Sequence, residues 1–282
     1  IMSSSSSAAR IVLLIDAEGN VVSETDLAGT SDLVTLNITV PEAGTYYIAS
    51  KESGINIYGI TVTVGGNSQG DDSQTGTDTP TGDITVNAEG DIYVAPKATG
   101  DGSSKENPTE FTAALKALKP GKTIFMADGT YKYSEMIVID KDNCGTADAM
   151  KSVKAENANK VTLDFSGMGY SGSDADKQNR GVVLDGSYWN FYGINITGAA
   201  DNGMILSGNN NVLEMCVFFA NHDSGLQVSR YRTDCATIDT WPSNNLIQNC
   251  TAYDNSDITG ENADGFAAKL TCGEGNVFDG CM

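Results

Sequence analysis

Two interleaved repeats in the second half of the chain constrain its fold more than any other feature. One repeat begins with a glycine followed by apolar residues, and its glycines are 22, 22 and 40 residues apart: Gly181, Gly203, Gly225 and Gly265. The other is a four-residue pattern in which an apolar residue is followed by two spacer residues and a small apolar residue. It occurs at 191–194, 213–216, 247–250 and 278–281. A coil of about 22 residues with loop insertions predicts a parallel β-helix, in which each coil buries its apolar side against the next.

Asparagines recur just before the second repeat, at Asn190, Asn211, Asn245 and Asn276. Asparagine tolerates a left-handed backbone and can bond its own turn, so we expect these residues at a corner between two faces of the coil.

The same register stacks one column of small apolar residues: Ile194, Cys216, Cys250 and Cys281. Since cysteine packs as a small hydrophobe, these three cysteines are expected to be core thiols. Cys235 and Cys272 lie in less regular segments and are the more favourable candidates for a disulfide.

The first part of the chain has a different organisation. Short strands are predicted at 9–16, 21–24, 33–40, 45–51 and 55–64, which indicates a small β-sandwich over residues 1–64 that loosely resembles part of a carbohydrate-binding jelly roll. Residues 65–85 are rich in Gly, Ser, Thr and Asp and read as a flexible linker. The β-helix domain then covers 86–282, and apolar residues at helical spacing within 108–118 predict a helix that caps its open end.

Charge narrows the classes of partner. The 17 Lys and Arg against 37 Asp and Glu give a formal net charge of −20, which disfavours nucleic acid and anionic membrane surfaces. No apolar run is long enough to span a membrane. An acidic protein can still bind an acidic polymer if a divalent cation held by carboxylates reverses the charge locally.

Two insertions carry the side chains that favour such chemistry. Between residues 228 and 245 lie Arg230, Arg232 and Trp241, and between 253 and 264 lie acidic residues: Asp254, Asp257 and Glu261. Together they predict a cleft for a charged sugar chain with a bound cation, although solvated loop charges would give the same pattern. The only histidine, His222, lies in a polar turn and is expected to be a turn residue.

Three segments of the chain resemble a known family. The segments 244–253, 263–269 (Ala-Asp-Gly-Phe-Ala-Ala-Lys) and 273–281, with a looser opening at 93–96 and 128–131, are similar to the pectate lyases of polysaccharide lyase family 9. The resemblance covers roughly residues 91–282. It implies a secreted bacterial enzyme with a right-handed parallel β-helix that cleaves polygalacturonate by calcium-dependent β-elimination.

The resemblance also implies roles for individual residues. Asp264, in the Ala-Asp-Gly-Phe segment, matches one of the family's Ca²⁺ ligands. The other ligands belong to an Asp-Asp-Gly-aromatic-Asp motif about one coil later, and the catalytic base is a lysine further on. Since the sequence ends at Met282, we expect it to be a fragment without that base.

Substrate contacts are expected from Lys269, Arg230 and Arg232. Lys269 lies five residues after Asp264, and along a continuous strand an odd spacing would point the two side chains to opposite faces, which argues against Lys269 as the base. Two alternatives stay open: an inverting glycoside hydrolase with acids such as Asp254 and Asp257, or a non-catalytic polysaccharide-binding or adhesin protein. In each case we expect a monomer.

Overall fold

The computed structural model describes residues 2–4, 10–17, 19–27, 38, 46–51, 55–57, 85–173, 175–257 and 263–282. The chain divides into two compact units, Ile1–Asp72 and Ser73–Met282, and each is considered by itself. The predicted boundaries at residues 64 and 85 stay a prediction, because most of the proposed linker lies outside the described ranges. Within those ranges, no helix has the length and apolar character needed to cross a membrane.

The described residues of the N-terminal unit form two antiparallel sheets. One has the order β3-β2-β4, from β2 (Arg10–Asp16), β3 (Val21–Leu27) and β4 (Tyr46–Ser50); the other pairs β1 (Met2–Ser4) with β5 (Ile55–Ile57). Val12 and Leu27 are fully buried and pack with Ile38 and Ile48. Antiparallel strands are therefore confirmed here. The predicted strand at 33–40 lies outside the described residues except for Ile38, and the jelly-roll likeness stays a prediction.

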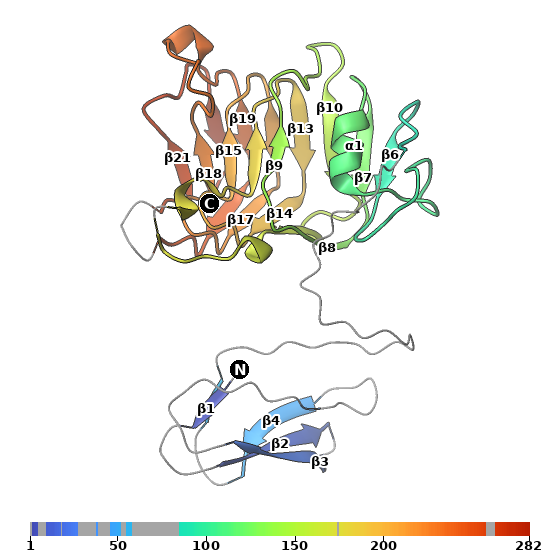
Figure 1. Cartoon of the computed structure of the whole chain (residues 1–282), viewed down its shortest axis with the longest axis vertical. Coiled ribbons are helices and arrows are strands. Elements are labelled where there is room, and N and C mark those ends of the chain that lie inside the picture. The colour runs from blue at the N-terminus through green and yellow to red at the C-terminus, as the bar shows by residue number, and fades with distance from the viewer. Residues whose placement is uncertain are drawn as a thin grey trace. The chain divides into compact units, whose positions relative to one another are not determined.

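The second unit is a parallel β-helix with three faces (Figure 1). The first sheet consists of β6 (Ile92–Val94), β7 (Thr123–Met126), β10 (Lys151–Ala155), β13 (Trp189–Tyr192), β16 (Val212–Glu214), β19 (Leu246–Gln248) and β22 (Val277–Asp279). The second consists of β8 (Gly129–Lys132), β11 (Val161–Asp164), β14 (Ile194–Thr197), β17 (Val217–Phe219) and β20 (Thr251–Tyr253). The third consists of β9 (Ile137–Ile139), β12 (Val182–Leu184), β15 (Met204–Leu206), β18 (Leu226–Val228) and β21 (Phe266–Ala268).

Both predicted repeats are confirmed in register. In the first sheet Phe191 pairs with Leu213, Leu213 with Ile247, and Ile247 with Phe278. In the third sheet the residues that follow the repeated glycines stack in the same way: Val182, Met204, Leu226 and Phe266. The β-helix also begins earlier than the sequence repeat, since β7 already pairs with β10 and β8 with β11.

A short helix packs against the first coils, as predicted. Helix α1 (Phe111–Ala117) begins after Glu110, whose buried carboxylate accepts hydrogen bonds from the backbone N–H groups of Thr112 and Ala113. Its apolar face joins the main core through Phe111, and it contacts β6 and β9. Among the described loop residues, three segments form short 3₁₀ helices: Ser166–Met168, Asp176–Gln178 and Ile238–Thr240.

Left-handed residues recur at the corners between faces. One column, just before the first sheet, contains Tyr188, Asn210, Asn244 and Gly275, and a second, between the first and second sheets, contains Gly193, Met215, Asn249 and Gly280. A third follows the second sheet at Gly198, Ala220 and Asp254. A single residue with positive φ re-aims the chain between short strands, so the corners repeat at the period of the coil.

An asparagine ladder lines the corner before the first sheet, here called the asparagine corner (Asn211, Asn245 and Asn276). The Oδ1 atom of Asn245 accepts the backbone N–H of Asn211 at 2.9 Å, and its Nδ2 donates to the carbonyl of Gly208 at 3.0 Å. Asn276 accepts the backbone N–H of Asn245 in the same way at 3.1 Å. Each amide thus joins two coils.

Two details of the predicted ladder were wrong. Asn190 pairs with Val212, so it lies one position out of register, and Trp189 occupies the ladder position instead. The ladder asparagines also do not carry the left-handed backbone, which falls on the preceding residues Asn210 and Asn244. The ladder asparagines thus join successive coils through side-chain hydrogen bonds and do not form the left-handed turn themselves.

The cysteines are all free thiols. Cys216 and Cys250 are buried in the core column as predicted, while Cys281 is partly exposed. The predicted pairing of Cys235 with Cys272 was wrong.

Candidate functional site

The glycines of the first repeat define a second corner, here called the glycine corner, at the entrance to β12, β15, β18 and β21. A Cβ atom on Gly203 would lie 2.7 Å from the carbonyl oxygen of Gly225, and one on Gly225 would lie 2.8 Å from that of Gly265. Glycine is therefore required by the close approach of successive coils. The residues just before these glycines form one polar column: Arg180, Asn202, Ser224 and Asp264.

Asp264 ends this column and is half exposed. Its Oδ2 atom lies 3.2 Å from Nζ of Lys269, and its backbone N–H donates to Oγ of Ser224 at 3.3 Å. The prediction that Asp264 and Lys269 point to opposite faces was wrong. Strand β21 includes only the three residues Phe266–Ala268, so the strand alternation does not extend across both side chains.

The described residues do not by themselves make a calcium site. Ca²⁺ takes roughly six to eight oxygen ligands. No group of three or more His, Cys, Asp or Glu side chains able to hold a metal occurs in the described part of the chain. Asp264 can supply one ligand, and Glu261 lies outside the described residues.

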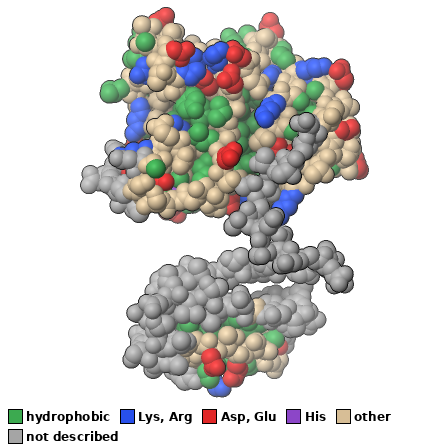
Figure 2. All heavy atoms as spheres, in the orientation of Figure 1, with side chains coloured by type: hydrophobic (Ala, Val, Ile, Leu, Met, Phe, Trp, Pro, Cys, Tyr) green, Lys and Arg blue, Asp and Glu red, His purple; other side chains and the backbone are tan. Residues whose placement is uncertain are grey.

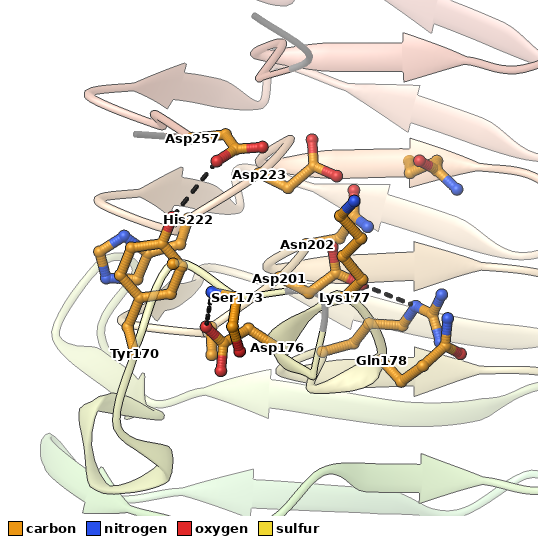
Figure 3. A pocket seen from close by; sticks show the side chains of 14 residues that line it. Tyr170, Ser173, Asp176, Lys177, Gln178, Asp201, Asn202, His222, Asp223 and Asp257 are labelled. Carbon is orange, nitrogen blue, oxygen red and sulfur yellow. Dashed lines mark hydrogen bonds and ion pairs between the residues drawn. The ribbon is translucent and has the colours of Figure 1, made fainter. Parts of the chain in front are cut away.

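A pocket of about 330 Å³ opens beside the same corner, on the coils that precede Asp264 (Figure 3). Its lining is mostly polar: Tyr170, Gly172, Ser173, Asp176, Lys177, Gln178, Arg180, Ala200, Asp201, Asn202, His222, Asp223, Gln227 and Asp257. The segment 170–180 supplies one wall, and the turns at 200–202 and 222–223 supply the floor from two successive coils.

The floor holds a buried carboxylate. Asp201 is 5% exposed, and its Oδ2 atom lies 3.4 Å from Nε of Arg180. Burial, and in second place the nearby Asp223, raise the pKa of Asp201 to about 7, against the opposing effect of the Arg180 guanidinium. Asp201 therefore changes its charge near neutral pH.

A flat aromatic pair forms another part of the wall. The rings of Tyr170 and His222 stack with centroids 3.7 Å apart and an interplanar angle of 6°. The Tyr170 hydroxyl donates to Oδ1 of Asp257 at 3.2 Å, and burial lowers the pKa of His222. His222, expected to be only a turn residue, thus lines a pocket.

The predicted arginines are engaged elsewhere. Nε of Arg232 donates to Oδ2 of the buried Asp185 at 2.7 Å, and Nη1 of Arg230 donates to the carbonyl of Cys235 at 2.9 Å. Neither arginine lines the pocket, nor do Asp264 and Lys269.

The acids proposed for a hydrolase are not grouped in the pocket. Asp254 is an exposed left-handed corner residue, equivalent to Gly198 and Ala220, and does not line the pocket. Asp257 does line it.

Sequence reasoning did not select Arg180, Asp201, Asn202 or Asp223. Their signal was a polar residue one or two positions before each repeated glycine. Such turns are common in any β protein, so only the stacking of coils shows that two of them share a pocket.

The surface charge is mixed on the face shown in Figure 2. Lys and Arg side chains lie among Asp and Glu along one edge of the β-helix unit, around a central hydrophobic area. This face therefore carries positive as well as negative side chains, although the chain as a whole has a net charge of −20.

Comparison with known proteins identifies the family. Residues 92–282 match the family model described as "Pel9A-like, right handed beta helix region". Pectate lyase L of Thermoclostridium stercorarium is 44% identical over 203 residues, which is 70% of this chain and 15% of that protein. Pectate lyase L of Paenibacillus polymyxa is 42% identical over 205 residues, which is 70% of this chain and 43% of that protein.

Solved structures agree. The crystal structure of pectate lyase Pel9A matches with a TM-score of 0.57 and 31% identity, over 70% of this chain and 48% of that one. A rhamnogalacturonan lyase, with a TM-score of 0.54 and 19% identity, shares the fold. The chain spans less than half the length of the curated relatives named here. The chain belongs to the Pel9A-like family of right-handed parallel β-helix proteins.

Proposed function

We propose that this chain belongs to a pectate lyase that cleaves polygalacturonate by calcium-dependent β-elimination. The observation that carries the proposal is the identity of this chain to two proteins named pectate lyase L, which is 44% and 42% over 70% of its length. Asp264 is the last residue of the stacked polar column at the glycine corner and lies within the residues that match the Pel9A-like family model.

The chemistry fits the side chains at this corner. Removing the C5 proton of a uronate requires that the adjacent carboxylate be neutralised and that a base be close by. Bound Ca²⁺ would supply the neutralising charge, with Asp264 as one ligand. Lys269, 3.2 Å from Asp264, would hold that carboxylate in place and contact substrate carboxylates.

The predicted arginines receive a smaller role. Arg232 pairs with the buried Asp185, and Arg230 is bonded to its own loop, so we propose that they shape the loop beside the substrate. The protein would act outside a bacterial cell, as a monomer, on acidic polysaccharide. The N-terminal unit would assist by binding carbohydrate.

A hydrolase is the second candidate, favoured by a specific observation. The pKa of Asp201 is raised to about 7, which suits a general acid, and a second carboxyl group, that of Asp223, lies beside it. Both residues line the pocket.

The decisive experiment incubates the intact protein with polygalacturonate and follows the ultraviolet absorbance of the unsaturated product. We expect absorbance that a chelator abolishes and that Asp264→Asn lowers at least tenfold, while the exposed loop variant Asp148→Asn leaves it unchanged. New reducing ends without absorbance would replace the lyase with the hydrolase. Affinity without either product would support a binding or adhesin protein.

A further inference from the structure

The pocket at the glycine corner contains a buried acceptor without a donor. Asn202 is 2% exposed, and its Oδ1 atom has no hydrogen-bond partner among the described residues. Oδ2 of Asp201 is also buried and makes no hydrogen bond there, although it lies 3.4 Å from Nε of Arg180. Nε of Arg180, a buried donor at the same cavity, also makes no hydrogen bond there. Buried polar atoms in folded proteins are nearly always hydrogen-bonded, so two acceptors and one donor beside one cavity indicate a ligand whose groups both donate and accept.

The charge of the lining restricts that ligand. Among the described lining residues, four are carboxylates (Asp176, Asp201, Asp223 and Asp257) and two are cations (Lys177 and Arg180). This excess of negative charge repels a carboxylate brought close to the floor. A free cation is also disfavoured at Asp201, because the Arg180 guanidinium already faces that carboxylate. Uncharged groups that donate hydrogen bonds fit best, and sugar hydroxyls are such groups.

The dimensions and walls agree with a single sugar ring. Ligand pockets in proteins have volumes of roughly 300 to 1,000 Å³, and about 330 Å³ lies at the lower end of that range. The stacked rings of Tyr170 and His222 give one side a flat, rigid wall, fixed by the bond from Tyr170 to Asp257. Figure 3 shows Asp201, Asn202 and Asp223 around the same space, with Lys177 beside them.

We propose that this pocket is a subsite for an uncharged sugar residue of the polymer, whose hydroxyl groups donate to Asp201, Asn202 and Asp223. A methyl-esterified galacturonate and a neutral sugar share this chemistry, whereas an unesterified galacturonate does not. The inference rests on the proposed function for the polysaccharide itself. It adds that the enzyme selects a position of the polysaccharide at which the sugar residue carries no charge.

The test is calorimetric binding to the whole chain in EDTA, where neither calcium bridges nor turnover contribute. Three probes are compared: trigalacturonate, its methyl ester, and a neutral galactose trisaccharide. We expect the ester or the neutral sugar to bind about tenfold more tightly than trigalacturonate, equivalent to about 1.4 kcal/mol. Which of the two binds identifies the source of the uncharged ring. Equal or tighter binding of trigalacturonate would overturn the proposal, as would no binding of any probe.

A matched pair of variants locates the effect. Asp223→Asn keeps the shape of the side chain but removes one charge and one strong acceptor. Affinity for the uncharged probe should therefore fall about fivefold to tenfold, while affinity for trigalacturonate should fall less or rise. The exposed Asp148→Asn should change neither. A uniform loss for all probes, or an equal effect of both variants, would contradict a subsite at Asp223.

A measurement on the unmodified protein covers the case in which Asp223→Asn does not fold. Backbone amide chemical shifts of residues 170–173, 200–203 and 222–227 should move when the uncharged probe is added. Shifts elsewhere only, or the same shifts with Ca²⁺ alone, would refute the sugar subsite. These results are independent of the lyase assay: a failed subsite leaves product absorbance intact, and a failed lyase assignment leaves calcium-free sugar binding intact.

Discussion

The asparagine corner and the glycine corner lie on the same coils and each contains a fully buried asparagine, yet the two buried amides are bonded differently. Asn245 is 1% exposed, and both ends of its amide are bonded to neighbouring coils. Asn202 is 2% exposed, and its Oδ1 atom is left without a partner in the described structure. The amides of the asparagine corner join successive coils by hydrogen bonds, whereas the glycine corner leaves buried polar atoms without partners beside a pocket.

The difference separates residues that stabilise the fold from residues that serve a ligand. A buried amide that loses its partners costs about 1 to 3 kcal/mol for each group left unsatisfied. The asparagine corner avoids this cost within the protein, while the glycine corner retains it until a ligand binds. Hydrogen-bond satisfaction thus distinguishes the two corners where burial does not.

The largest expected effect concerns Asp201, and it tests whether an ionised carboxylate destabilises the fold at the glycine corner. The pKa of Asp201 is raised from its ordinary value of 3.8 to about 7, so between these values the folded state binds more protons than the unfolded state. Stability therefore falls as pH rises through this window, by up to about 4 kcal/mol. Asp201→Asn removes this dependence, because an amide does not titrate.

The measurement is urea unfolding at pH 4.5 and pH 7.5, followed by tryptophan fluorescence, since Trp189 and Trp241 both belong to the β-helix unit. The stability of the unmodified protein minus that of Asp201→Asn should be larger at the lower pH. If this difference is the same at both pH values, the carboxyl group is as well accommodated as the amides of the asparagine corner.

The second prediction compares one asparagine from each corner. Asn245→Ala leaves the N–H of Asn211 and the carbonyl of Gly208 without partners, so unfolding free energy should fall by about 3 kcal/mol. Asn202→Ala removes an Oδ1 atom that has no partner in the described structure and one side-chain hydrogen bond to Asp201, so the loss should be smaller, about 1 kcal/mol. Urea unfolding with the same fluorescence probe measures both. Equal losses would erase the distinction between the corners.

Much of the fold was predictable because stacking imposes a period on the sequence. The apolar residues Phe191, Leu213 and Ile247 and the repeated glycines stand at one register, and the structure confirms it. The asparagine ladder was found except for one position. Asn211, Asn245 and Asn276 each lie two residues before the apolar repeat, whereas Asn190 lies only one before it, so the spacing in the sequence already favours Trp189 as the ladder residue. The first coils were not recognised, since loops of different length hide their period.

The site was less predictable, for a physical reason. Asp201 and Asp223 lie one coil apart, and their shared environment arises from stacking and from the loop at 170–180. Arginines chosen for their charge proved to be bonded within the protein, as Arg232 is to Asp185. Charge in a loop does not by itself locate a site, because hydrogen-bond partners decide which side chains are available to a ligand.

The smallest stability effect is expected at Lys269, and it separates the exposed end of the glycine corner from its buried floor. Lys269 and Asp264 have side chains that are 38% and 54% exposed, so their ion pair at 3.2 Å is solvated and contributes about 0.5 kcal/mol or less. Lys269→Gln should therefore leave urea unfolding nearly unchanged. In the intact protein the same variant should raise KM for polygalacturonate severalfold, because a substrate carboxylate loses a cation. A variant that lowered stability by 2 kcal/mol and left KM unaltered would assign Lys269 to the fold, together with the amides of the asparagine corner.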